Sequence, residues 1–113
     1  MKIDKGLMSG STTLLVLSLL KGGDMYGYEM IEELARRSSD AFQLKEGTLY
    51  PVLHGLLNKG VVECYEKEAP TGRMRKYYHI TKRGLEELKE ETEQWRRYSG
   101  GIEAVLSFAP VMG

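Results

Sequence analysis

Residues 46–60 read EGTLYPVLHGLLNKG, and this stretch decides the fold that the sequence predicts. Its apolar residues recur every three or four positions and Gly60 stops the run, a pattern typical of an amphipathic helix over residues 46–59. If that helix begins at Thr48, Pro51 lies in its first turn; if it begins earlier, Pro51 predicts a kink. The apolar stripe consists of Leu49, Val52, Leu53, Leu56 and Leu57.

The opposite face of this helix carries small residues and uncharged hydrogen-bonding groups when it is placed on a wheel of about 100° per residue. A face without Lys, Glu or Arg suits close approach to another surface. Thr48, His54 and Asn58 are able to hydrogen bond to base edges in a DNA groove. The alternative is an exposed face without a partner. The face consists of Gly47, Thr48, Pro51, His54, Gly55 and Asn58, with Tyr50 on its flank.

Two helices are expected before this one. Residues 9–21 are apolar on almost every side and end at Gly22-Gly23. Such a helix must be covered on two sides, which is difficult for a small monomer, so it indicates a dimer. Residues 25–38 predict an amphipathic helix with Asp24 as its N-cap. Its apolar stripe consists of Tyr28, Ile31, Leu34 and Ala35.

After Gly60 the pattern changes to alternation. Residues 61–66 and 77–81 predict two β-strands, and the turn residues 69–72 between them predict a hairpin. Thr81 then caps a long last helix, which Gly100-Gly101 interrupts at a cost of about 2 kcal/mol in helix propensity. Steps of three and four along this helix form a heptad seam of Leu85, Leu88, Thr92, Trp95, Ser99, Ile102 and Leu106.

The order helix, helix, helix, hairpin, helix is that of a winged helix-turn-helix module with an added C-terminal helix. The predicted fold class is therefore mainly α with a two-stranded β-hairpin. We expect residues 1–81 to form the winged helix-turn-helix DNA-binding domain. Residues 82–113 are expected to form a C-terminal dimerisation helix and tail, within one structural unit.

The composition is that of an ordinary soluble, globular chain of one domain. Its 113 residues are 42% hydrophobic and 28% charged, and 16 basic residues balance 16 acidic ones. No apolar run approaches the roughly 20 residues that span a bilayer. The single cysteine, Cys64, excludes an internal disulfide. We therefore expect a cytoplasmic protein.

The net charge of zero hides a local asymmetry. Residues 71–83 hold five basic residues and no acidic one, whereas acidic residues collect on the last helix. A glycine-tipped hairpin that carries arginines is able to lie along phosphates and release counterions. A basic hairpin next to a bare helix therefore indicates nucleic-acid binding. The five residues are Arg73, Arg75, Lys76, Lys82 and Arg83.

Nothing in the sequence indicates an enzyme, a cofactor or a metal site. Cys64, His54 and His79 would hold a metal only if the fold brought them together, and His54 is expected to point outward. No Ser-His-Asp arrangement has supporting context. Gly22-Gly23 lacks the surrounding pattern of a phosphate-binding loop.

The motifs of the chain resemble those of the PadR family of bacterial transcriptional regulators. The resemblance rests on residues 46–60, on GGDMYGYE at residues 22–29 and on GRMRKYYHITKRG at residues 72–84. It covers about residues 10–97. The combination of a GTLYP-type helix start with an RKYY-x-(I/L)-T strand is specific.

This resemblance implies a homodimer that binds a roughly palindromic operator, usually as a repressor that a small molecule releases. In such proteins the third helix enters the major groove and the hairpin wing touches the backbone or the minor groove. The last helix packs against the first helix of the partner subunit. The short last helix resembles that of the small subfamily. Trp95 resembles the tryptophan with which multidrug-binding members stack flat aromatic ligands, the alternative being plain interface packing.

The candidate site residues follow from these patterns and from the resemblance. The expected DNA contacts are Tyr26, Lys45, Gly47, Thr48, Tyr50, His54, Arg73, Arg75 and Lys76. The expected ligand contacts are Trp95, Thr92, Ser99 and Ile102. Two rival functions are a winged-helix module that binds proteins and a dimer that sequesters drugs without regulating DNA.

Overall fold

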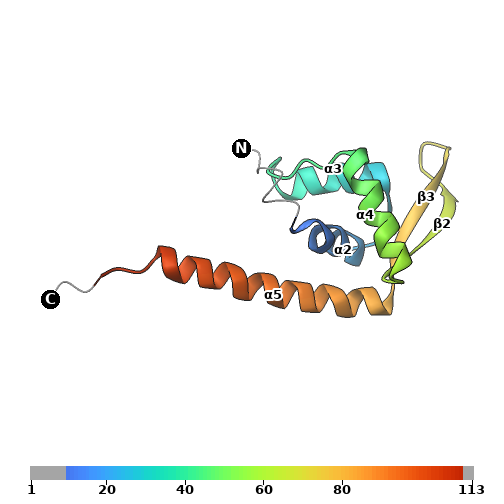
Figure 1. Cartoon of the computed structure of the whole chain (residues 1–113). Helices are drawn as coiled ribbons and strands as arrows, with labels where there is room; N and C mark the ends of the chain where they lie inside the picture. Colours follow the sequence, from blue (N-terminus) through green and yellow to red (C-terminus); the bar gives the residue numbers. More distant parts are fainter. Residues whose placement is uncertain (1–9, 111–113) are drawn as a thin grey trace.

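The structure is a computed structural model that describes residues 10–110. Over these residues it contains four α-helices and one three-stranded antiparallel sheet (Figure 1). Residues 1–9 and 111–113 lie outside this part of the chain. They include residue 9 of the first expected helix and the outer ends of the two expected domains. The elements are α2 (Thr12–Lys21), β1 (Met25–Tyr26), α3 (Gly27–Arg37), α4 (Glu46–Asn58), β2 (Val62–Glu68), β3 (Met74–Ile80) and α5 (Lys82–Leu106).

Helices α2, α3 and α4 lie together beside the sheet, and α5 runs along this body and then projects beyond it (Figure 1). The strand order is β1-β3-β2, so the second strand of the hairpin is the central one. This is a winged helix-turn-helix with an added C-terminal helix, and the predicted fold class is confirmed. No helix within residues 10–110 has both the length and the hydropathy that crossing a bilayer requires.

The core is centred on α2, which packs against α3, β3 and α5 of its own chain. Val16, Leu17 and Leu20 are buried there and belong to one apolar cluster with Leu49 and Leu53 of α4. The other elements of one chain already surround these side chains, whereas Leu14 and Leu15 of the same helix are only partly buried. Burial of α2 therefore does not by itself require a partner subunit, and the support for a dimer has to come from elsewhere.

The second helix starts later than expected because Met25–Tyr26 form the short strand β1. Tyr26 is the N-cap of α3, and its backbone N–H donates to Glu29 Oε1 at 3.1 Å. The prediction that Asp24 caps this helix is wrong, since its carboxylate contacts the hairpin instead. The inward stripe is also shifted: Met30 is buried, whereas Tyr28 is 54% exposed.

Three helix-breaking residues lie inside continuous helices. α4 begins at Glu46, so Pro51 lies in its second turn and has no N–H for the carbonyl of Gly47. In α5 the helix continues through Gly100-Gly101 to Leu106, so the expected interruption is absent. A Cβ on either of these glycines would meet no atom within 4 Å.

Gly84, by contrast, is required by close packing in the first turn of α5. Thr81 caps this turn as predicted, because its Oγ1 accepts from the N–H of Gly84 at 3.1 Å and donates to the carbonyl of Gly60 at 2.8 Å. A Cβ at position 84 would lie 2.1 Å from the carbonyl oxygen of Val61 and 2.7 Å from Ile80 Cγ1. The backbone junction between α4 and the sheet therefore leaves no room for a side chain.

We predict that Gly84→Ala lowers the free energy of unfolding by about 1–3 kcal/mol, because the backbone of Val61 must move to admit the methyl group. Gly100→Ala in the same helix has open space around it and should raise that free energy by about 0.5–1 kcal/mol through helix propensity. Urea unfolding at one protein concentration measures both. Equal effects of the two substitutions would contradict the packing described for Gly84.

Candidate nucleic-acid interface

The outer face of α4 is open to solvent along the length of the helix. Leu49, Leu53 and Leu56 are buried against the body. The leucine stripe thus orients the helix, and the small and uncharged residues are turned outward, as the wheel predicts. The exposed residues from the N-cap onward are Lys45, Glu46, Gly47, Thr48, Tyr50, Pro51, His54, Gly55 and Asn58.

Tyr50 differs from the rest of this face because it reaches back to the start of α3. An added Cβ on Gly27 would lie 2.6 Å from the Tyr50 hydroxyl oxygen and 3.0 Å from its Cζ. The ring thus occupies the space that a side chain at position 27 would need. The glycine of the sequence YGY therefore has a packing reason, and Tyr50 joins the two helices of the helix-turn-helix.

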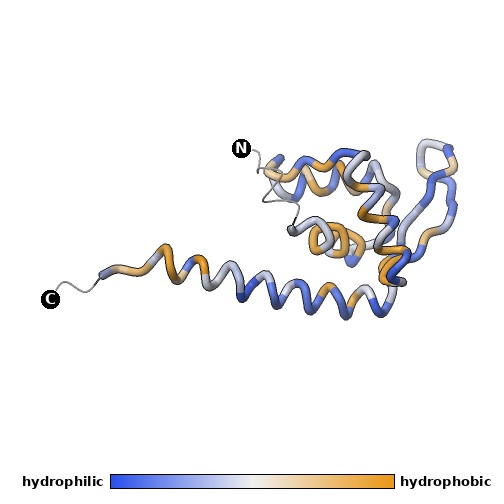
Figure 2. Tube along the Cα trace, viewed as in Figure 1, coloured by the Kyte–Doolittle hydropathy of each residue, from blue (hydrophilic) through white to orange (hydrophobic). Residues whose placement is uncertain are grey.

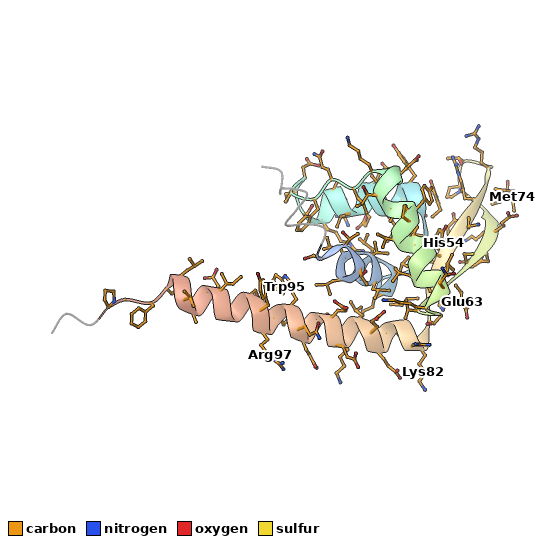
Figure 3. The ribbon with its side chains drawn as sticks, viewed as in Figure 1. His54, Glu63, Met74, Lys82, Trp95 and Arg97 are labelled. Carbon is orange, nitrogen blue, oxygen red and sulfur yellow. The ribbon has the colours of Figure 1, made fainter. Side chains whose placement is uncertain are left out.

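The wing is the hairpin of β2 and β3 (residues 62–80), which pair antiparallel over seven residues. Alternate residues of a strand point to opposite faces. Tyr78 and Ile80 belong to the core, so Lys76 lies on the inner face of the wing. Arg75 and Tyr77 lie on the outer face. His54 on α4 and Met74 on the wing lie at the same end of the molecule, away from the far half of α5 (Figure 3).

The outer face of the wing carries a stack of tyrosine rings. The Tyr77 ring lies 5.9 Å from that of Tyr65 in a nearly parallel arrangement and 5.4 Å from that of Tyr26, edge-on. Lys67 Nζ lies 4.8 Å from the centre of the Tyr77 ring, and the Arg75 guanidinium lies 5.5 Å from that of Tyr26. Such contacts contribute about 0.5–1 kcal/mol each at exposed sites. The stack therefore fixes the places of two wing cations.

Arg73 and Arg75 have different surroundings. Arg73 lies in the exposed tip. Arg75 is half-buried, and its Nε is buried without a hydrogen-bond partner among the residues that the structure describes. Glu66 of β2 lies opposite Lys76, so the neighbouring strand supplies an acid that the run of residues 71–83 does not contain. Arg73 at the exposed tip is therefore open to a phosphate, whereas Arg75 is partly enclosed.

A carboxylate from outside the hairpin contacts both wing strands. The Tyr65 hydroxyl donates to Asp24 Oδ2 at 2.6 Å, and His79 Nδ1 lies 2.8 Å from Asp24 Oδ1. Burial by itself raises the pKa of Asp24, but the Tyr65 hydrogen bond and the His79 ring outweigh it and hold this pKa below its usual value. The hydrogen bond to the carboxylate also raises the pKa of Tyr65 to about 12. Both shifts report a contact that stabilises the charged Asp24 and the neutral Tyr65.

A hollow lies where the starts of α3 and α4 meet the wing. It brings together Tyr26, Tyr50, Arg75 and Lys76, four of the residues expected to contact DNA. Tyr28 lines it as well, and sequence reasoning missed this residue because helical spacing assigned it to the apolar stripe of α3. The other expected contacts, namely Lys45, Gly47, Thr48, His54 and Arg73, are exposed outside the lining of this hollow.

The residues expected to bind a ligand are distributed over separate hollows of one chain. Trp95 lines an open hollow with Leu14 of α2, and with Glu91 and Tyr98 of α5. Thr92 lines a different hollow with Lys21, Leu85 and Arg96. Ile102 lies in a third, with Val105 and Leu106. The hydroxyls of Thr92 and Ser99 donate to the carbonyls of Leu88 and Arg96 in the preceding turn.

The candidate metal ligands of the sequence lie on three different elements. His54 is on α4, Cys64 on β2 and His79 on β3. His79 is engaged by Asp24. Within residues 10–110 no group of three His, Cys, Asp or Glu side chains is arranged to hold a metal ion.

Comparison with known sequences identifies relatives over most of the chain. The profile of a family described as "Transcriptional regulator PadR-like family" matches residues 16–90. Uncharacterized protein X of Lysinibacillus sphaericus is 38% identical over 89 residues, which are 79% of this chain and 82% of that protein. The transcriptional regulator YqjI of Escherichia coli (strain K12) is 27% identical over 85 residues, which are 75% of this chain and 39% of YqjI. The chain thus spans well under half of YqjI.

Solved structures with the same architecture also come from bacterial regulators. A PadR-like transcriptional regulator from Bacillus cereus superposes with a TM-score of 0.82 at 28% identity, covering 93% of this chain and 100% of that one. A transcriptional regulator from Clostridium thermocellum superposes with a TM-score of 0.80 at 30% identity, covering 88% of this chain and 96% of that one. These alignments include α5 as well as the winged module, because they extend over nearly the whole chain.

Proposed function

The chain belongs to the PadR-like family of transcriptional regulators and is therefore a DNA-binding regulator and not an enzyme; from this premise we propose that it is a cytoplasmic, homodimeric repressor. It binds a roughly palindromic operator and leaves it when a flat aromatic ligand binds. The main support is the juxtaposition of the bare outer face of α4 with the cations of the wing.

In this proposal α4 enters the major groove and the wing lies along the backbone. Thr48 and His54 have the exposure and hydrogen-bonding groups that base edges require. Arg73, Arg75 and Lys76 would contact phosphates, which give affinity and register but carry no sequence information. The hollow that Tyr26 and Tyr50 line between α3, α4 and the wing offers space for the intervening backbone.

The proposed homodimer is supported by the far half of α5, which lacks cover within residues 10–110. Its apolar side chains recur at steps of three and four and are between 42% and 77% exposed. Figure 2 shows the last turns of α5 as hydrophobic, beyond a hydrophilic middle part. A second copy would cover the strip in a two-fold interface, and two-fold symmetry favours a palindromic operator. The strip consists of Trp95, Tyr98, Ile102, Val105 and Leu106.

Release by a ligand is supported by the hollow next to Trp95. The indole points from α5 toward the helical body, whereas Arg97 points away (Figure 3). An indole that is 49% exposed offers a face on which a planar ring stacks, and the neighbouring Glu91 favours a cationic one. Because Trp95 is part of the strip that pairs the subunits, a ligand there would change the spacing of the two α4 helices and so select against the DNA-bound arrangement.

We predict that Arg73→Ala and His54→Ala weaken DNA binding in different ways. Arg73→Ala should weaken binding to all duplexes about equally and reduce the slope of log affinity against log salt by about one per lost contact, roughly two for a dimer. His54→Ala should cost on the order of 1–3 kcal/mol on cognate DNA only. Mobility-shift titrations with the DNA upstream of the chain's own gene and with a random duplex, at several salt concentrations, measure both.

Each variant serves as the control of the other in this experiment. An unchanged salt slope for Arg73→Ala would remove Arg73 from the phosphate contacts. Equal losses on cognate and random DNA for His54→Ala would remove His54 from base recognition. A wild-type chain that binds neither duplex would favour a protein-interaction module on the same scaffold.

We predict that flat aromatic dyes quench the fluorescence of Trp95 in a saturable way. Trp95 is the only tryptophan of the chain, so the signal reports this position alone. Trp95→Ala should abolish dye affinity, measured by calorimetry, and leave a dimer in analytical ultracentrifugation. Monomers instead would assign the indole to subunit packing, and dye binding that leaves DNA affinity unchanged would favour a drug-sequestering dimer.

A further inference from the structure

The main-chain pairing between the wing and β1, the strand that precedes α3, is short. Only two residue pairs, Met25 with Tyr78 and Tyr26 with Tyr77, join β1 to the hairpin. The hairpin itself continues past this attachment toward its tip at residues 69–73. Burial of Val62, Tyr78 and Ile80 in the core anchors the base of the hairpin. Beyond Tyr77 the hairpin has no pairing with a third strand within residues 10–110, and two strands alone are marginally stable, so side-chain contacts have to fix its direction there.

Asp24 supplies a side-chain contact that spans the sheet. It precedes β1, yet its two carboxylate oxygens contact different wing strands: Oδ1 lies 2.8 Å from His79 of β3, and Oδ2 accepts from the Tyr65 hydroxyl of β2 at 2.6 Å. The Asp24 side chain is 31% exposed and that of His79 is 50% exposed, so the contact is partly shielded from water. A charge-assisted hydrogen bond is shorter and stronger than a neutral one.

The contact continues toward the DNA-facing part of the wing through the tyrosine stack. Tyr65, held by Asp24, stacks on Tyr77, and Tyr77 meets Tyr26 edge-on. The guanidinium of Arg75 lies over that last ring. Moving Tyr65 therefore disturbs a chain of contacts whose far end is a wing cation.

We infer that Asp24 is a positioning residue for the wing: by holding Tyr65 and His79 from the turn that follows α2, it fixes the direction of the hairpin and the place of Arg75. Its role in DNA binding rests on the proposed function. Its role in ordering the wing does not, and the two are tested separately.

The first experiment needs no DNA. Amide hydrogen exchange by NMR on the free protein should become roughly fivefold faster or more in residues 66–76 of Asp24→Ala, with the amides of α3 and α4 unchanged. Asp24→Asn retains an acceptor for Tyr65 and should recover part of the protection. Glu33→Ala is the matched control, because Glu33 also has a depressed pKa, held to about 2 by Arg36 and Arg37, but both of these partners lie on its own helix, α3.

The second experiment measures affinity for the DNA upstream of the chain's own gene. Asp24→Ala should weaken binding by roughly fivefold or more, and Glu33→Ala should leave it unchanged. In a double-mutant cycle, Asp24→Ala should cost little once Arg75→Ala is present, because both act through the same wing cation. A merely structural Asp24 would give an additive cycle, and thermal unfolding of each variant identifies any loss that comes from the fold.

The outcomes separate the two ideas. Unchanged exchange in the wing of Asp24→Ala, or equal effects of the Asp24 and Glu33 variants, would overturn the inference. An additive cycle would overturn the link to Arg75. If the wild type fails to bind DNA, the proposed function fails, and the exchange measurements still decide whether Asp24 orders the wing.

Discussion

Burial of α2 is the constraint on which the rest of this structure depends. Val16, Leu17, Leu19 and Leu20 lose nearly all contact with solvent, and each such side chain is worth about 1.5–3 kcal/mol when buried. Because α3, β3 and α5 all pack on this helix, their directions are set by its surface. The leucine stripe of α4 joins the same cluster, which turns the outer face of α4 to solvent.

The surfaces that this packing leaves uncovered are those to which the proposed function assigns DNA and a second subunit. The charges are balanced overall, yet they are unevenly placed: the tip and β3 of the wing carry Arg73, Arg75 and Lys76, β2 carries glutamates, and further acids cluster on α5 at residues 86–93. A strip of exposed apolar side chains lies on the far half of α5. The proposed function thus places DNA binding and subunit pairing at opposite ends of one molecule, and α5 connects these ends as a single continuous helix.

In the wing, neighbours on the adjacent strand give a residue surroundings that its own stretch of sequence does not show. From one strand, residues 71–83 are a basic run. In the sheet, Lys76 faces Glu66 on one side of the hairpin, while Arg75 lies over Tyr26 on the other. Asp24 is a similar case. Local spacing in the sequence predicts that it caps a helix, whereas in the structure its carboxylate contacts Tyr65 and His79 of the sheet.

The sequence by itself determined the order of the helices and the hairpin, the inward stripe of α4 and the cap at Thr81, because these depend on spacing within a few residues. Tertiary structure alone decided that Met25–Tyr26 form a strand, that Asp24 contacts the wing and that Trp95 and Thr92 line different hollows. Each of these needs residues far apart in the chain to meet. Gly84 and Gly100 illustrate the difference: helix propensity treats them alike, and only the carbonyl of Val61 beside position 84 separates a required glycine from a tolerated one.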